Sequence, residues 1–151
     1  MTEANQTYAI VAFGDINGPD CRITADSVFD GLFAKGEWYI TRPTASLFKG
    51  TKVLFYQNGR GIRGSALVGD VKECRTTHIL GRHVYASFSH RLVLDECAMF
   101  VEPVNIRPLV PVLDFISNKV HWGQSFRTTP RRISEKDYLA ITRQADSREN
   151  L

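Results

Sequence analysis

The chain has 151 residues, of which 43% are hydrophobic and 23% charged, and its formal net charge is +3. This length and balance fit one globular domain and exclude disorder over most of the chain, so we expect a single domain with an ordered core from about residue 7 to 143. No apolar run reaches the roughly 18 residues of a membrane span, and the start MTEANQT lacks a signal peptide's order, so we expect a cytoplasmic protein.

The first 41 residues predict a strand, a helix and a second strand. Residues 7–13, TYAIVAF, are apolar and rich in strand formers, and a loop of turn-forming residues follows them. Residues 24–36 carry apolar side chains at helical spacing, and Thr24 or Asp26 can cap the start of this helix. Residues 37–41, EWYIT, predict a short strand or an extended edge.

The middle of the chain predicts a β-hairpin and a further strand. Residues 52–57 and 65–71 flank NGRGIRG, and the pair Asn58-Gly59 favours the positive φ angles of a tight turn. The same glycines do not open a helix, so a hairpin explains them better than a phosphate-binding loop does. Residues 83–89 alternate between apolar and polar side chains, as a half-buried strand does.

The last third of the chain predicts strand and loop, then helical turns. Prolines exclude a long helix from residues 91–110, and residues 111–119 fit one or two helical turns. Ser134 and Asp137 resemble a capping box that starts a short terminal helix. Five or six strands with short flanking helices predict an α+β fold built on a small, mixed, mostly antiparallel β-barrel.

Positive charge collects in two blocks of the sequence. Residues 1–34 contain one base and five acids, whereas residues 35–91 contain ten bases and three acids. A second block, HWGQSFRTTPRRIS at residues 121–134, carries three arginines and two aromatic side chains without an acid. Such blocks suit a polyanionic partner if they share one surface, and otherwise only keep the protein soluble.

Catalytic and metal-binding signatures are missing from the sequence. It contains no GxSxG, Walker or HExxH motif and no GxGxxG motif between a strand and a helix. Their absence favours a binding module over an enzyme. The cysteines are odd in number, and neither they nor the histidines have metal-ligand spacing. We therefore expect no metal, no cofactor and no disulfide at these residues: Cys21, Cys74, Cys97, His78, His83, His90 and His121.

Several segments together resemble a known superfamily. These are YAIVAFG, the helix that leads into AKGEWYIT, the strand pair KVLFYQNGRGIRGSALVGDV and the ending NKVHWGQSFRTTPRRISEKDYLAI. In this order they resemble the EVE and YTH branches of the PUA-like superfamily, and the resemblance covers nearly the whole chain. It implies a compact PUA-like barrel with a pocket that holds one nucleobase, usually a modified one, in an aromatic cage.

The resemblance also implies which residues hold the base. Trp38 matches the cage tryptophan that follows the helix, and an indole face suits stacking on a base. Tyr39 and Thr41 match polar contacts to the base edge, and Asp15 and Asn17 lie in a loop that contributes to the same pocket.

One feature of the YTH branch is missing. A second cage tryptophan belongs after the strand pair, where this chain reads RTTHILGRH. The residues that can replace it as the missing wall are His78, Leu80, His83 and Tyr85.

Arginines are expected to contact the nucleic-acid backbone. Arg127 matches the family position for this contact, in a strand before the terminal helix, and Arg131 and Arg132 extend the same cationic segment. Only one of Arg131 and Arg132 can face the ligand if that segment is extended, because side chains alternate along a strand. Arg60 and Arg63 on the hairpin are further candidates.

The leading prediction is a cofactor-free module that reads a modified base in DNA or RNA, alone or together with a nuclease or other effector. The related ASCH branch includes amidohydrolases of acylated nucleosides that use Lys, Thr and Glu, and Thr51, Lys52 and Glu73 supply these residue types. A protein-interaction module, in which the aromatic residues are core, is the remaining alternative. A free face on Trp38 favours the reader, and turnover of an acylated cytidine favours the hydrolase.

Overall fold

The structure is a computed structural model that describes residues 6–42, 44–127 and 129–149. Residues 1–5 and 150–151, which the sequence places outside the ordered core, are not among the described residues. No helix in the described ranges is long and apolar enough to cross a membrane.

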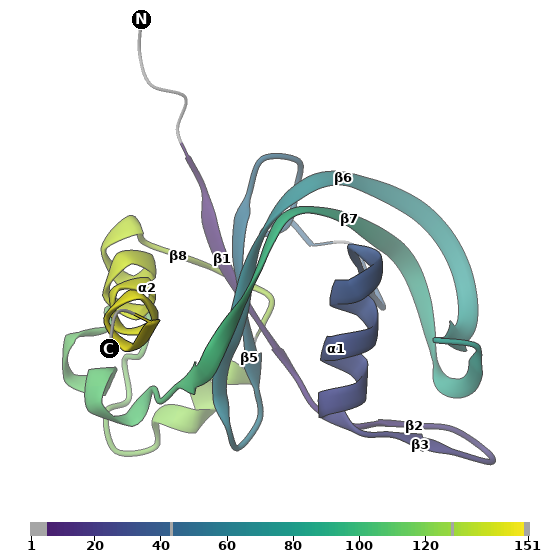
Figure 1. The fold of residues 1–151 in the computed structure, drawn as a ribbon, viewed down its shortest axis with the longest axis horizontal. Helices are drawn as coiled ribbons and strands as arrows, with labels where there is room; N and C mark the ends of the chain where they lie inside the picture. The colour runs from purple at the N-terminus through teal and green to yellow at the C-terminus, as the bar shows by residue number, and fades with distance from the viewer. Residues whose placement is uncertain (1–5, 43, 128, 150–151) are drawn as a thin grey trace, which may run out of the picture.

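A six-stranded sheet runs through the centre of the molecule (Figure 1). Strands β1 and β5 pair in parallel and the other neighbours pair antiparallel. In spatial order the strands are β4 (Glu37–Ile40), β7 (Arg82–Val104), β6 (Gly61–Ile79), β5 (Lys52–Gln57), β1 (Tyr8–Phe13) and β8 (Arg131–Ile133). A separate two-stranded hairpin consists of β2 (Ile16–Asn17) and β3 (Arg22–Ile23).

Strands β6 and β7 form an arch over helix α1 (Ala25–Lys35), as Figure 1 shows. Their pairing shifts register at five points, and such bulges bend and twist a strand pair. The sheet curls but stays open, with β4 and β8 as its two unpaired edges. The predicted closed barrel is therefore wrong, because α1 fills the concave side of the sheet and keeps the edge strands apart.

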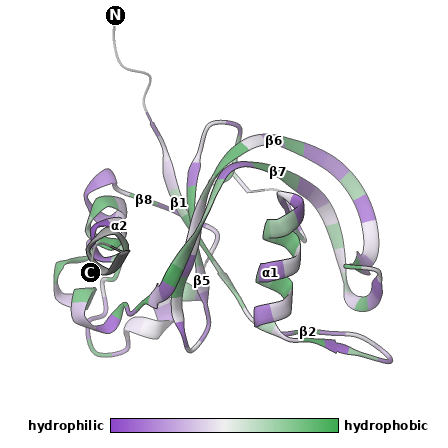
Figure 2. Cartoon of the chain, viewed as in Figure 1, coloured by the Kyte–Doolittle hydropathy of each residue, from purple (hydrophilic) through white to green (hydrophobic). Residues whose placement is uncertain are grey.

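Two hydrophobic clusters lie on opposite faces of the sheet. The first packs α1 against the concave face, and the second packs η1 (Arg107–Val112), η2 (Trp122–Phe126) and α2 (Glu135–Glu149) against the other face. Strand β5 serves both clusters, since Phe55 belongs to the first and Leu54 to the second. Green apolar bands accordingly run along the central strands in Figure 2.

Local signals set the ends of helix α1. Of the two predicted caps Thr24 is the one used, and its hydroxyl accepts the Ser27 N–H at 3.3 Å. Asp15 adds a second cap, because its carboxylate accepts the Ala25 N–H at 2.8 Å. Gly36 ends the helix at a φ of 67°, a left-handed conformation that favours glycine.

The predicted hairpin is confirmed, with its turn between β5 and β6 and Gly59 at a φ of 80°. The following strands are longer than predicted, because residues 61–79 and 82–104 form one continuous pair. The helical turns expected at residues 111–119 are displaced, since the 3-10 helix η1 ends at Val112. Pro111 has no N–H to donate, so it interrupts the hydrogen bonding of this turn and disfavours a regular α-helix there.

Asp137 connects α2 to the segment before it. The predicted start of this helix is confirmed, with the Ser134 hydroxyl accepting the Asp137 N–H at 3.1 Å. The Asp137 carboxylate is fully buried and accepts the backbone N–H groups of Asp114 and Phe115, each at 2.9 Å. This one carboxylate therefore satisfies two buried donors that have no strand partner.

We expect Asp137→Asn to lower the free energy of unfolding by about 2 kcal/mol, because an amide cannot accept both N–H groups at full strength. Urea denaturation followed by circular dichroism measures this change. Asp114→Asn is the matched control, since Asp114 is exposed and its ion pair with Lys136 contributes about 0.5 kcal/mol or less. Equal effects of the two substitutions would contradict the role given to Asp137.

Candidate binding pocket

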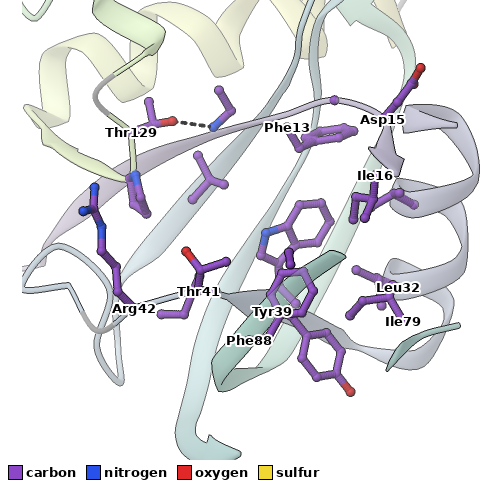
Figure 3. Close-up of a pocket in the computed structure, with 18 of the residues that line it drawn as sticks. Phe13, Asp15, Ile16, Leu32, Tyr39, Thr41, Arg42, Ile79, Phe88 and Thr129 are labelled. Atoms are coloured by element: carbon purple, nitrogen blue, oxygen red, sulfur yellow. Dashed lines mark hydrogen bonds between the residues drawn. The ribbon is translucent and has the colours of Figure 1, made fainter. Parts of the chain in front are cut away.

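A cavity of about 950 Å³ opens beside α1, where β1, β4, the β6–β7 arch and the segment before β8 meet (Figure 3). Most of its lining is apolar: Val11, Ala12, Phe13, Ile16, Val28, Leu32, Ile40, Ile79, Ala86 and Phe88. Polar side chains lie among the remaining lining residues: Asp15, Asn17, Thr41, Arg42, Thr44, Tyr85, Arg127 and Thr129. Its size and mixed lining are typical of small-ligand sites.

The cavity brings together most of the predicted base contacts. These are Trp38, Tyr39, Thr41, Asp15, Asn17 and Tyr85. The alternatives at the tip of the β6–β7 hairpin are absent from the lining: the rings of His78 and His83 stack on each other at 5.1 Å, and Leu80 lies against Gly31 of α1. Among the proposed replacements for the missing wall, only Tyr85 reaches the cavity.

Trp38 is part of the hydrophobic core as well as of the cavity lining. Trp38 is only 4% exposed. The centroid of its ring lies 5.2 Å from that of Phe13 and 4.8 Å from that of Phe55. So little exposed surface leaves no open ring face of the size of a base. Stacking on Trp38 stays a prediction that its burial argues against.

Tyr39 contributes its ring to the cavity wall. The ring meets Phe88 edge-on at 5.9 Å, and its hydroxyl donates to Glu37 at 3.3 Å. Glu37 in turn pairs with Arg91 at 3.1 Å. Burial and the nearby Glu37 carboxylate raise the pKa of Tyr39, so the hydroxyl stays protonated. The Tyr39 hydroxyl, for which contact with the base edge is predicted, thus already donates its hydrogen bond to Glu37.

The other predicted polar residues fall into two groups. Asp15 has a structural role, since it pairs with Arg22 at 3.1 Å in addition to capping α1. Asn17 and Thr41 are exposed, and within the described ranges their side chains have no hydrogen-bond partner. Asn17 and Thr41 are therefore available to contact a ligand.

Two arginines lie at the cavity without a counter-charge. Arg127 is a predicted residue, although it follows the 3-10 helix η2 and does not lie in the predicted strand. Sequence reasoning missed Arg42. Its position directly after Thr41, just beyond the end of β4, is the signal that could have identified it. Both side chains are exposed, and no acid among the described residues forms an ion pair with either of them.

The hairpin arginines have a structural role, and their contact with a nucleic-acid backbone stays a prediction. Arg60 and Arg63 both donate to Asp26 of α1, at 2.6 and 2.8 Å, and Arg63 also lies over the Phe29 ring at 4.8 Å. Gln57 donates to the same Asp26 oxygen at 3.0 Å. This network connects the β5–β6 hairpin to the start of α1, and neither arginine lines the cavity.

The arginines of β8 point to opposite sides of the sheet, as strand alternation predicts. Arg131 lies over the Phe115 ring at 5.6 Å, in the cluster on the far side from the cavity. Arg132 is exposed and pairs in register with Ala9, which faces the α1 side. Neither arginine lines the cavity, and their contact with a nucleic-acid backbone stays a prediction.

The residues of the hydrolase alternative are not assembled at the cavity. Thr51 is fully buried and hydrogen-bonds the Thr7 hydroxyl at 3.1 Å. Neither it nor Lys52 nor Glu73 lines the cavity. In the described part of the chain, no three potential metal ligands lie close enough to hold an ion, and the cysteines are unpaired.

The chain is similar to a Bacillus licheniformis protein and, among several solved structures, to a YTH domain. No protein-family model matches the chain. The UPF0310 protein in the gntR 5′ region of Bacillus licheniformis is 28% identical over 98 residues, which is 61% of this chain and 64% of that protein, so less than two thirds of the relative is covered. The YTH domain of the Zygosaccharomyces rouxii MRB1 protein, solved in complex with N6-methyladenosine RNA, matches 95% of this chain and 87% of that chain with a TM-score of 0.48 and 14% identity.

The sequence identity to the Bacillus licheniformis protein and the TM-score to the YTH domain are both too low to place the chain in a family. Its likeness to the EVE and YTH branches and its membership of the PUA-like superfamily therefore stay predictions.

The network around Asp26 predicts a pH-dependent contribution to stability. The Gln57 hydrogen bond, and then the charges of Arg60 and Arg63, lower the pKa of Asp26 below its ordinary 3.8. A lowered folded pKa stabilises the fold above pH 3.8, and this contribution disappears as the pH falls through the folded pKa. We expect Asp26→Asn to reduce stability at pH 7 and to have little effect near pH 2.

Urea midpoints of the wild type and the variant across this pH range measure the effect. Asp20→Asn is the control, because Asp20 is an exposed carboxylate with no ion pair among the described residues. A constant difference between wild type and Asp26→Asn at all pH values would contradict the network.

Proposed function

We propose that this protein binds nucleic acid and takes up one base, a modified one by preference, in the cavity beside α1. The observation that carries the proposal is a mainly apolar cavity of about 950 Å³ whose lining includes Arg42 and Arg127. Neither arginine forms an ion pair among the described residues. A base needs apolar walls for its faces, and the phosphates on either side of it need cations.

The lining suits a planar heterocycle. The half-buried ring of Tyr39, which packs against Phe88, contributes flat apolar surface, which also accommodates an added methyl group. Asn17 and Thr41 supply free polar groups of the kind that read a base edge. Only an unpaired or flipped base can enter such a cavity, so a single strand or a locally opened duplex is the proposed substrate.

Tyr85 and the two arginines suit the strand outside the cavity. Tyr85 is 72% exposed and lines the cavity, so its ring is open to a ligand. An exposed aromatic ring in this position can stack on a neighbouring base, and this stacking removes apolar surface of both rings from water. The proposed partners are thus DNA or RNA, with an effector protein or domain as a further partner.

The charge at the cavity predicts the salt dependence of binding. We expect Arg42→Ala and Arg127→Ala each to weaken binding of a short fluorescent single-stranded oligonucleotide several-fold. Each substitution also lowers the slope of log affinity against log salt by about 0.7, the value for one lost phosphate contact on a single strand. Fluorescence anisotropy from 20 to 200 mM salt, roughly the range over which phosphate contacts weaken, measures both quantities.

Arg143→Ala is the matched control, because Arg143 is exposed on α2 at the other face of the sheet. The panel includes RNA and DNA strands with plain and methylated adenine and cytosine. If no strand binds at the lowest salt concentration, the proposed function is wrong. An equal loss of affinity with Arg143→Ala and Arg42→Ala would show that binding depends on the net charge of the protein and not on the arginines at the cavity.

Filling the cavity separates base capture from electrostatic attraction. Ala86 lines the cavity, so Ala86→Phe occupies the space of the base without changing any charge. We expect this variant to lose the preference among bases and at least tenfold in affinity for the best strand, while weak, salt-sensitive binding remains. Ala98→Phe, at an exposed position of the same strand, is the control and should bind like the wild type.

A further inference from the structure

We infer that Trp38 acts as a hydrogen-bond donor to the ligand, through its indole N–H, and that the cavity therefore selects a planar group with an acceptor atom at its inner edge. This inference deepens the proposed function and rests on it for the identity of the ligand as a base. It also replaces the stacking role that the sequence suggests for this tryptophan.

The packing of Trp38 leaves little of the indole ring exposed. Phe13 meets the indole at an interplanar angle of 74° and Phe55 at 59°, with centroids 5.2 and 4.8 Å away. Only 4% of the residue is exposed. A ligand therefore reaches an edge of this ring and not a face.

The polar atom of that edge is the indole nitrogen. Within the described residues, Trp38 has no hydrogen bond to any protein group. Among the same residues, no fully buried side-chain nitrogen or oxygen lacks a partner. The Trp38 N–H is thus unpaired but not sealed in the core, and the open space that the residue borders is the cavity.

An unpaired N–H beside an apolar cavity has a definite chemical preference. An indole N–H can only donate, so it favours a ring nitrogen or a carbonyl oxygen and disfavours an amino group. Leaving this N–H without an acceptor costs free energy, which is why buried donors are nearly always satisfied in native proteins. The base is therefore expected to enter with a ring nitrogen or a carbonyl oxygen toward Trp38.

The test compares pyridine with benzene on the unaltered protein. The two rings have the same shape and differ in one acceptor atom, and pyridine is neutral at pH 7.5. The readout is the pair of indole resonances in a ¹H–¹⁵N spectrum, because the chain contains two tryptophans, Trp38 and Trp122. Trp122 packs in the cluster on the other face of the sheet and reports general effects of the additive.

We expect pyridine to move the Trp38 indole resonance downfield in a saturable manner, while benzene leaves it in place or moves it upfield through its ring current. No response to pyridine, or equal responses to both rings, would overturn the inference. This experiment needs no nucleic acid, so its outcome does not depend on the proposed function.

A second measurement relates the donor to the oligonucleotide. Trp38→Phe keeps an aromatic ring and removes the N–H, and we expect about a fivefold loss in affinity for the best strand, as for one hydrogen bond. Trp122→Phe is the control and should have no effect. Strand binding that leaves the Trp38 resonance unmoved would refute the inference and keep the function, whereas a pyridine response without any strand binding would do the reverse.

Discussion

The structure depends on the packing of one aromatic helix face into a bent strand pair. Phe29 and Phe33 of α1 lie 4.1 Å apart, and Phe33 meets Phe55 of β5 at 5.0 Å. Gly64 of β6 allows this close approach, because a Cβ there would lie 3.1 to 3.2 Å from the two helix rings and closer still to the backbone of β7. The sheet arches around this helix and stays open, with β4 and β8 as its two edges.

The same packing decides which charges are free. The hairpin carrying Arg60 and Arg63 lies against the start of α1, where Asp26 neutralises both. Arg91 of the arch is neutralised by Glu37 in the same way. Three of the ten bases between residues 35 and 91, namely Arg60, Arg63 and Arg91, are thus neutralised within the molecule, and a count of lysines and arginines overstates its attraction for a polyanion by these three. Two other cations, Arg42 and Arg127, lie at the cavity and form no ion pair among the described residues.

Sequence reasoning succeeded where the cause was local. The Asn58-Gly59 turn, the Thr24 cap and the Ser134 start of α2 each depend on a few adjacent residues. It failed where the cause was distant: whether the sheet closes depends on α1, and whether Arg63 is free depends on a carboxylate 37 residues earlier. The burial of Trp38 is of this second kind, because Phe13 and Phe55 come from two other strands.

The cavity is best understood as a part of the first core that the protein leaves unfilled. Phe13, Leu32 and Phe88 belong to the buried cluster and to the cavity lining at once. Side chains that face an unfilled space forgo packing contacts, so the fold is less stable than a filled core would make it, and a ligand that occupies the space restores those contacts. Binding and folding are therefore coupled at the apolar walls. They are separable at the polar entrance, where the exposed side chains of Arg42 and Arg127 form no hydrogen bond or ion pair with another described residue.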